Sequence, residues 1–159
     1  GDLNTLFNNG SSGFQLAELQ LLTNGVPVPY PAGTSVTAPG GSYYDGGYPF
    51  PPIRAVDNDT SGAAANRWYS DAMVNPLTVD MKQQVTFDAY RWFTAWNVSG
   101  RDPKSWTLEV SNNTTNWYTV DVRTNQTVTT ARSVAACAAC CATRSATSAC
   151  CGRRSCSTR

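Results

Sequence analysis

The feature that most constrains the fold is a two-residue alternation of apolar and polar side chains in the second half of the chain. Residues 77–81 have the sequence Leu-Thr-Val-Asp-Met, and residues 106–110 have the sequence Trp-Thr-Leu-Glu-Val. Because successive side chains of a β-strand point to opposite faces, both segments are predicted to be half-buried strands. The turn sequence at 112–116 is followed by β-favouring residues at 117–122, which predicts a hairpin.

Two further segments and the overall composition favour an all-β fold. Residues 85–96 are apolar on both faces in their second half, as in a central strand of a two-sheet sandwich. Residues 14–22 lie between turn signals and are predicted to form one strand. The chain has 12 Gly, 9 Pro, 5 Trp, 7 Tyr and 5 Phe, a composition typical of turn-rich β-proteins. At 159 residues, it is long enough for one β-sandwich or jelly roll.

The charges of the chain exclude several classes of function. Histidine is absent, so no imidazole is present for acid–base catalysis, and Asp57 and Asp59 are the only close pair of carboxylates. We therefore predict that the protein is not an enzyme. The formal net charge is +1, and residues 1–133 carry 8 basic and 11 acidic side chains, so no basic surface for nucleic acid is expected. No apolar run reaches the roughly 18 residues of a transmembrane helix.

The last 26 residues, 134–159, differ from the rest of the chain. They contain all 6 cysteines, between Cys137 and Cys156, and no Trp, Tyr or Phe. Without such residues this irregular, Ala/Cys/Arg/Ser-rich tail is not expected to form a sheet core. Three origins stay open: a disulfide knot, a metal-binding segment, or translation in a shifted reading frame. The adjacent cysteine pairs and the lack of histidine argue against a familiar disulfide scaffold and against a zinc site.

Asn-x-Ser/Thr sequons, which are acceptors for N-glycosylation, indicate the compartment. Their excess favours the secretory pathway, and hence an extracellular or cell-surface protein, although Asn, Ser and Thr also occur together in β-turns. The candidate glycosylation sites are Asn9, Asn58, Asn97, Asn112, Asn113 and Asn125.

A group of oxygen-bearing residues at 57–61 is the best candidate for a metal site. Asp57, Asp59 and Ser61 match the start of an EF-hand loop, but its twelfth position is Trp68 where a Glu is needed, so the EF-hand is rejected. Another kind of calcium site is possible here, and the strand phasing of 14–22 directs Glu18 inward to join it. The alternative is a solvated network of Asx turns without a metal.

Residues 26–53 are rich in Pro, Gly and Tyr and are predicted to form an ordered surface excursion. Tyr43, Tyr44 and Tyr48 lie within it. Exposed aromatic side chains can stack on sugar rings or on a protein partner, and they can also simply cover the side of a sandwich. If a ligand-binding face exists, its predicted residues are Tyr43, Tyr44, Tyr48 and Trp96 for stacking, with Arg101 as a polar contact.

Over residues 14–132, the sequence resembles the discoidin, or coagulation-factor C-type, domain. The resemblance is strongest in Arg-Asp-Pro-Lys-Ser-Trp at 101–106 and in the strand that follows it. The other matching motifs are Phe-Gln-Leu-Ala-Glu-Leu-Gln-Leu at 14–21, Ala-Val-Asp-Asn-Asp-Thr at 55–60, Arg67-Trp68, Leu-Thr-Val-Asp at 77–80 and Tyr-Arg-Trp at 90–92.

The resemblance implies a galactose-binding-like β-sandwich jelly roll. In many relatives a structural Ca²⁺ is held by an Asp-containing turn and by a Glu from the Gln-Leu-Ala-Glu-like strand. Those roles correspond here to Glu18, Asp57, Asp59, Thr60 and a carbonyl near Ala55. That strand usually closes such a domain but opens the body here, so the resemblance implies either a shifted strand order or a shortened preceding strand, with Asp2–Phe7 as its remnant.

These observations divide the chain into a lead or remnant strand at 1–13, a discoidin-like sandwich at 14–133 and the tail at 134–159. The resemblance and the sequons together predict a non-catalytic extracellular module for adhesion or structural assembly within a larger glycoprotein. Its expected partners are other protein chains or further domains of the same glycoprotein, with glycans as a further candidate class. Two alternatives are a carbohydrate-binding module that targets an appended enzyme and an intracellular assembly subunit.

Overall fold

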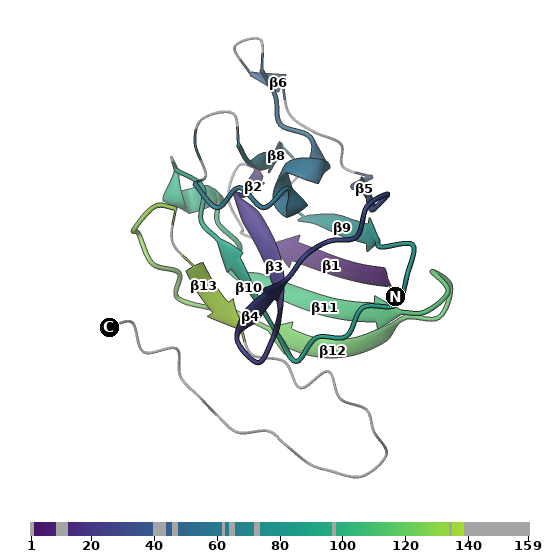
Figure 1. Cartoon of the computed structure of the whole chain (residues 1–159). Coiled ribbons are helices and arrows are strands. Elements are labelled where there is room, and N and C mark those ends of the chain that lie inside the picture. Colours follow the sequence, from purple (N-terminus) through teal and green to yellow (C-terminus); the bar gives the residue numbers. More distant parts are fainter. Residues whose placement is uncertain are drawn as a thin grey trace.

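The computed structural model describes residues 2–8, 13–39, 44–45, 48–61, 63, 66–71, 74–96, 98–133 and 135–138. Regular structure in these residues is almost entirely β, and the helical elements are two short 3-10 turns, η1 (Pro52–Val56) and η2 (Ser99–Arg101). Antiparallel sheets pack around a common core (Figure 1). The predicted all-β sandwich is confirmed.

The larger sheet has five antiparallel strands. They are β1 (Asp2–Asn8), β5 (Ser35–Thr37), β9 (Val74–Asp80), β11 (Ser105–Ser111) and β12 (Tyr118–Arg123), in the order β12-β11-β1-β9-β5. Residues 2–8, expected from the sequence to be a lead or remnant strand, form its middle strand and pair with both β9 and β11. The alternation at 77–81 and 106–110 is the inward and outward alternation of β9 and β11, whose apolar residues Leu77, Val79, Trp106 and Leu108 are buried.

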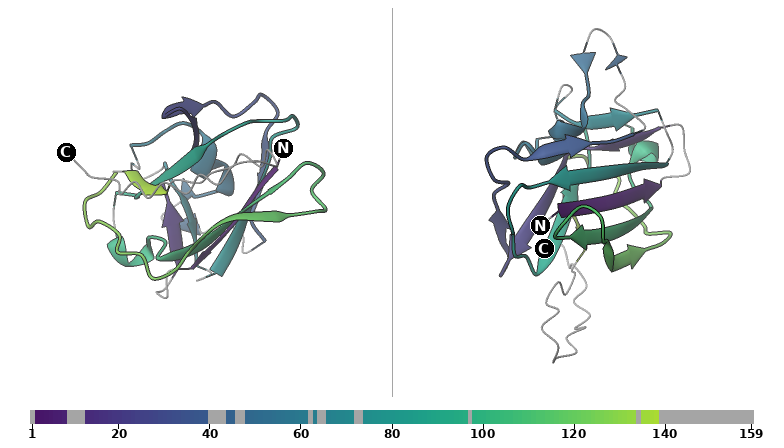
Figure 2. Two further views of the ribbon diagram at one scale, coloured as in Figure 1. Left: turned by 90° about the horizontal axis from the view of Figure 1, so that it is seen from below. Right: turned by 90° about the vertical axis from the view of Figure 1, so that its right-hand side faces the viewer.

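The smaller sheet has four strands and faces the larger one (Figure 2). Its members are β3 (Glu18–Thr23), β4 (Val26–Val28), β10 (Ala89–Phe93) and β13 (Ala135–Ala138), in the order β13-β10-β3-β4. The central strand predicted at 85–96 is the shorter β10, which pairs with β3 and β13. Residues 135–138 belong to the tail that was expected to be irregular, yet they add an edge strand. The cysteines beyond Cys137 lie outside the described residues.

The segment 14–22, predicted to be one strand, is two strands that belong to different sheets. β2 (Phe14–Leu16) pairs with β8 (Trp68–Ser70), whereas β3 pairs with β10. The chain changes sheet at Ala17, whose N–H donates to the Phe93 carbonyl at 3.0 Å. Every residue from 13 to 22 is buried, so the sequence carries no alternation that would reveal the break. This change of sheet makes Glu18 the first residue of β3.

A chain of hydrogen bonds joins the two sheets in the core. The Trp106 indole N–H donates to the Tyr90 hydroxyl at 2.5 Å, and that hydroxyl donates to an Asp121 carboxylate oxygen at 2.6 Å. The rings of Trp92 and Trp106 meet edge to face, with centroids 5.7 Å apart. Because Tyr90 and Trp92 lie on β10 while Trp106 lies on β11, these contacts fix how the sheets face each other.

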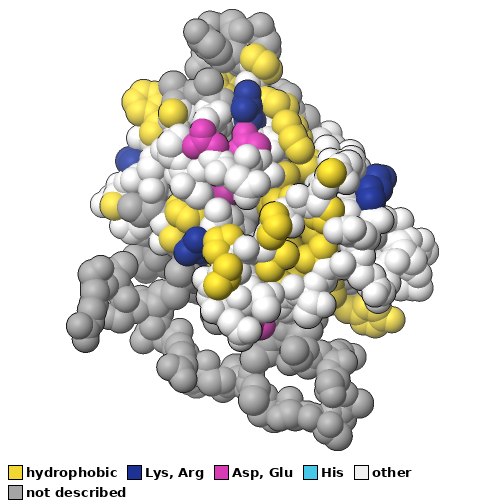
Figure 3. All heavy atoms as spheres, in the orientation of Figure 1, with side chains coloured by type: hydrophobic (Ala, Val, Ile, Leu, Met, Phe, Trp, Pro, Cys, Tyr) yellow, Lys and Arg dark blue, Asp and Glu magenta, His cyan; other side chains and the backbone are white. Residues whose placement is uncertain are grey.

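The described residues of 26–39 run over the outside of the sandwich, and apolar side chains gather over β4 and the chain that follows it (Figure 3). Further along, β6 (Tyr44–Asp45) and β7 (Tyr48–Pro49) pair as a hairpin that stands out from the sandwich (Figure 1). No helix in the described part of the chain is long and apolar enough to cross a membrane.

Candidate functional site

Glu18 is a fully buried carboxylate beside the acidic turn at 57–61. One oxygen, Oε2, accepts the Asn58 backbone N–H at 3.1 Å, and the other, Oε1, has no hydrogen-bond partner in the described structure. Burial and then the nearby negative charge of Asp57 raise the pKa of Glu18 to about 9, against the opposing effect of the Asn58 N–H. The inward orientation expected from strand phasing places this side chain against the turn.

The turn itself is held by its own side chains. Asp57 Oδ1 accepts the Asp59 N–H at 3.0 Å, and Asp57 Oδ2 forms an ion pair with Arg54 at 3.1 Å. Asp59 Oδ1 accepts the Ser61 N–H at 2.8 Å, and hydrogen bonds from the Ser61 hydroxyl and N–H lower the pKa of Asp59. Asn58 has φ 67°, in the left-handed region that Asn tolerates at such turns. These are the Asx-type contacts that the sequence also allowed.

The predicted calcium ligands therefore lie in one neighbourhood without converging on one point. Ala55 lies within η1, one residue before its end, and is buried, and Thr60 is half-buried in the turn. Among the described residues, no three His, Cys, Asp or Glu side chains are arranged to hold a metal ion. The donor set still fits a hard cation, because the unpartnered Glu18 oxygen lies near two further carboxylates and the carbonyls of a tight turn.

A second feature is the loop that joins β10 to β11, residues 94–104, which contains η2. Among the described residues of this loop, the most exposed large apolar side chains are Trp96 and Val98, at 49% and 47%. The Arg101 guanidinium lies over the Tyr69 ring, 4.4 Å from its centroid, in a cation–π contact. The structure thus brings the predicted residues Trp96 and Arg101 into one loop, with Arg101 stacked on an aromatic ring of β8.

Buried polar groups fix this loop to the sandwich. Gln15 of β2 donates from Nε2 to the Val98 carbonyl at 2.7 Å and to Asp102 Oδ1 at 3.3 Å. Asp102 is 1% exposed and pairs with Arg132 at 2.6 Å, while Arg132 also donates to the Ala95 carbonyl at 3.2 Å. Burial raises the pKa of Asp102, and the Arg132 and Gln15 contacts oppose that rise. The loop is therefore presented in a defined conformation.

The sequence did not predict the stack beneath this loop. Arg67 lies 4.2 Å from the Phe50 ring centroid, and Phe50 meets Tyr69 edge to face at 6.2 Å, so Arg101 completes an Arg-Phe-Tyr-Arg series. Its members come from η2, β8 and the chain beside them. Only the two-residue spacing of Arg67 and Tyr69 about the buried Trp68 could have indicated that their side chains point to the same side of the chain.

The other predicted residues are less fully described. Tyr43, Asn9 and Asn97 lie outside the described residues. Tyr44 and Tyr48 lie in the β6–β7 hairpin, where Tyr44 pairs with Pro49 and Tyr48 with Asp45, and their side chains are not described. The remaining sequon asparagines are all exposed: Asn58, Asn112, Asn113 and Asn125.

Comparison with protein families gives a match to the F5/8 type C domain over residues 34–136, which is more than half of the chain. The protein belongs to the F5/8 type C, or discoidin, domain family, which confirms the resemblance seen in the sequence. Comparison with curated proteins and with solved structures gave no match. Domains of this family are generally non-catalytic, bind carbohydrates, lipids or proteins, and typically occur in extracellular or surface proteins.

Proposed function

We propose that this domain is a non-catalytic binding module that serves adhesion or structural assembly within an extracellular or cell-surface glycoprotein. The observation that carries the proposal is the 94–104 loop, where exposed apolar side chains stand on a buried polar framework. Trp96 and Val98 are about half exposed, whereas Gln15 and Asp102 beneath them are almost fully buried. Protein-binding surfaces are centred on such anchors, in which a large exposed side chain is held by a rigid support.

The family and the composition support binding without catalysis. The chain has no histidine, and its buried carboxylates Glu18 and Asp102 are engaged with backbone N–H, Gln and Arg groups. An extracellular location is supported by the exposure of the described sequon asparagines. The proposed partners are other protein chains or further domains of the same glycoprotein.

The proposed binding is tested with the full chain immobilised on a sensor and exposed to purified extracellular glycoproteins and to a glycan array. We expect Trp96→Ala to weaken protein binding by about tenfold or more, because an interface anchor contributes on the order of 2 kcal/mol. Tyr118→Ala is the matched control, since Tyr118 is 58% exposed on β12, outside the 94–104 loop.

Three results would contradict the proposal. The first is the absence of binding to any protein or glycan, and the second is equal protein binding by wild type and the Trp96 variant. Binding to glycans alone, with no protein bound, would replace adhesion by the function of a carbohydrate-binding module.

We also propose that the turn at 57–60 binds a structural Ca²⁺ together with Glu18. Glu18, Asp57, Asp59 and Thr60 would supply side-chain oxygens, and Ala55 a backbone carbonyl. The support is the buried Glu18 oxygen that has no hydrogen-bond partner among the described residues, beside two more carboxylates. Bound calcium would neutralise these charges and tie the start of β3 to the turn after η1.

Thermal unfolding with Ca²⁺ and with a chelator tests this site. A ligand that binds only the native state stabilises it, by about 2.7 kcal/mol when its concentration is 100 times Kd. We expect calcium to raise Tm in wild type and in the control Glu109→Gln, but not in Glu18→Gln. An unchanged Tm in wild type would contradict the calcium site.

A further inference from the structure

The chain that joins β12 to β13, residues 124–133, passes the 94–104 loop on its way from the larger sheet to the smaller one. We call this segment the strap. It contains no helix or strand, so its conformation depends on the side chains and main-chain groups that it contacts. Many of these contacts are made with the loop.

Hydrogen bonds connect the strap to both ends of the loop. At the start of the loop, the Ser133 N–H donates to the Thr94 carbonyl at 3.0 Å, and the Thr94 hydroxyl donates to the Ala131 carbonyl at 3.1 Å. At the end of the loop, the Gln126 N–H donates to the Lys104 carbonyl at 2.7 Å. The strap therefore lies along the loop instead of crossing it at one point.

Arg132 is the strap side chain that reaches into the loop. Its Nη1 donates to the Ala95 carbonyl at 3.2 Å, and its Nη2 forms an ion pair with Asp102 at 2.6 Å. The same guanidinium donates to the strap's own carbonyls, from Nε to Thr130 at 3.1 Å and from Nη2 to Thr129 at 3.0 Å. A planar group with five N–H donors can join these three segments at once, whereas an ammonium group cannot match the same geometry.

The ion pair is buried, so Asp102 depends on Arg132. Asp102 is 1% exposed, the Arg132 side chain is 20% exposed, and no other basic side chain in the described part of the chain pairs with Asp102. Loss of one partner from a buried ion pair leaves a charge that burial strongly disfavours. Asp102 also accepts from Gln15, which donates to the Val98 carbonyl. The effect of Arg132 therefore extends to Val98, which the guanidinium does not contact.

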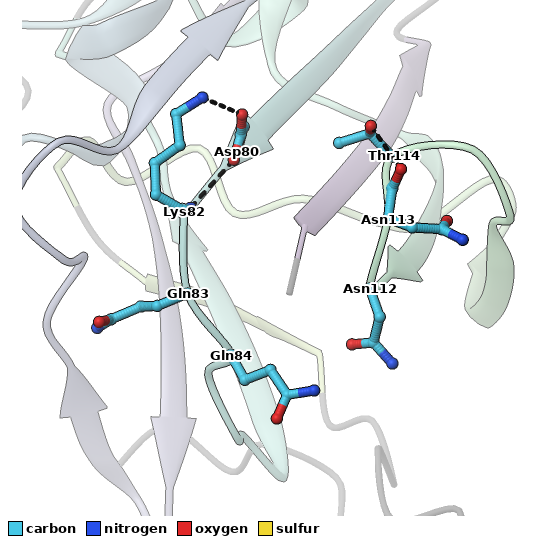
Figure 4. Close-up of a pocket in the computed structure, with 7 residues that line it drawn as sticks. All are labelled: Asp80, Lys82, Gln83, Gln84, Asn112, Asn113 and Thr114. Carbon is cyan, nitrogen blue, oxygen red and sulfur yellow. Dashed lines mark hydrogen bonds and ion pairs between the residues drawn. The ribbon is translucent and has the colours of Figure 1, made fainter.

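The turns at the other end of β11 and β9 are held differently. Residues 82–84 and 112–114 lie on the two sides of a hollow there (Figure 4). Asp80 Oδ1 accepts the Lys82 N–H at 3.0 Å, so that contact joins residues two positions apart. The ion pair between the strap and the loop, by contrast, joins residues 30 positions apart in the sequence. The conformation of the loop thus depends on a segment that lies outside it.

We propose that Arg132 is a positioning residue for binding through the 94–104 loop, which presents Trp96 and Val98 only while the strap is docked. This inference rests on the proposed function of the loop and adds a means of regulating it. The strap leads directly into β13, the edge strand of its sheet, which pairs with β10. Displacement of β13 from β10 would draw the strap away and release the loop. The C-terminal strand would then control a binding surface to which it contributes no residue.

Amide hydrogen exchange on the full chain tests this coupling without any partner. The reporters are the N–H groups of Arg101 and Asp102, which donate to the carbonyls of Val98 at 3.1 Å and Ser99 at 3.3 Å inside the loop. We expect Arg132→Ala to accelerate exchange of these two amides at least tenfold more than exchange of the β1 and β9 amides, because the loop opens locally. Arg132→Lys, which keeps the charge but not the planar fork, should give an intermediate rate.

A double variant separates positioning from the cost of a buried charge. Asp102→Asn/Arg132→Ala removes both charges, so no unpaired carboxylate remains. If Arg132 served only to neutralise Asp102, this variant would exchange like wild type. If Arg132 positions the loop, exchange in the loop stays at least tenfold faster than in wild type while the urea midpoint recovers relative to Arg132→Ala. The matched control is Gln126→Ala, which removes an exposed strap side chain but keeps the N–H that contacts Lys104.

Binding is measured on the same sensor, with the purified extracellular glycoprotein that wild type binds most tightly. We expect Arg132→Ala to weaken this binding at least tenfold, although Trp96 and Val98 are unchanged, and Gln126→Ala to bind like wild type. Wild-type exchange of the reporter amides in Arg132→Ala or in the double variant would overturn the proposal, and so would faster exchange with unaltered binding. If wild type bound no protein, the proposed function would fail, and the exchange rates alone would decide whether Arg132 positions the loop.

Discussion

Replacement of Tyr90 by Phe tests the hydrogen-bond chain that joins the two sheets. The Tyr90 hydroxyl accepts from the Trp106 indole at 2.5 Å and donates to Asp121 at 2.6 Å. Phe keeps the ring and its packing but removes the hydroxyl. Asp121 retains its ion pair with Arg123 at 2.8 Å, whereas the Trp106 N–H loses its acceptor in a side chain that is 5% exposed.

The expected cost follows from these two losses. A hydrogen bond to a charged group contributes about 1.5–3 kcal/mol, and an unsatisfied buried donor costs about 1–3 kcal/mol. Because Asp121 keeps a partner, we expect a total loss of about 3 kcal/mol in the free energy of unfolding. That is a large share of the roughly 5–15 kcal/mol that stabilises a domain.

Urea unfolding, followed by tryptophan fluorescence, measures this loss. The midpoint should fall with an unchanged m-value, which would show a change in stability without a change in the surface exposed on unfolding. Tyr118→Phe is the control, because this exposed tyrosine should change the free energy of unfolding by less than about 0.5 kcal/mol. If Tyr90→Phe cost no more than the control, the hydrogen-bond chain would not couple the sheets as described.

Two further predictions concern pH and backbone conformation. Burial raises the pKa of Tyr90 and of Tyr30 above that of an unfolded tyrosine, about 10, so both contribute stability that is fully present below pH 10 and lost as the pH rises above it. In an absorbance titration of the tyrosines, Tyr90 and Tyr30 should ionise only when the protein unfolds. Ionisation of every tyrosine in the folded state would refute this prediction. Gly13 has φ 87°, and an added Cβ would lie 2.8 Å from a β8 carbonyl, whereas Gly25 has φ 81° and open space. Gly13→Ala should therefore cost at least about 1 kcal/mol more than Gly25→Ala by urea unfolding, and equal costs would contradict the close approach.

The sequence predicted those strands whose two faces differ in environment. Alternation located β9 and β11, because one side of each faces the core and the other is half-buried. Alternation could not locate the change of sheet at Ala17, because the residues on both faces of this segment are buried and no polar face marks the break. The edge strand at 135–138 was also missed, because its Ala-Ala-Cys-Ala sequence lacks β-favouring residues and its pairing depends on β10.

The candidate sites were predictable to different degrees. Strand phasing placed Glu18 inward, and family resemblance connected it to the turn at 57–60, where the Asn58 N–H contacts its carboxylate. The partner of Arg101 could not be predicted, because Tyr69 is 32 positions away and reaches it only through the pairing of β8 with β2. The hollow between residues 82–84 and 112–114 is formed by two turns whose residues are ordinary turn formers, so its existence depends on the register of β1 with β9 and β11.

Hydrogen–deuterium exchange on the full chain, free and bound to the extracellular protein that it binds most tightly, tests the central claim most directly. If the 94–104 loop is the binding surface, the slowed amides should lie in residues 98–102 and in the adjoining β2 and β8 strands. Slowed exchange confined to residues 80–84 and 112–114, or to the β12 edge, with the loop unchanged, would contradict it.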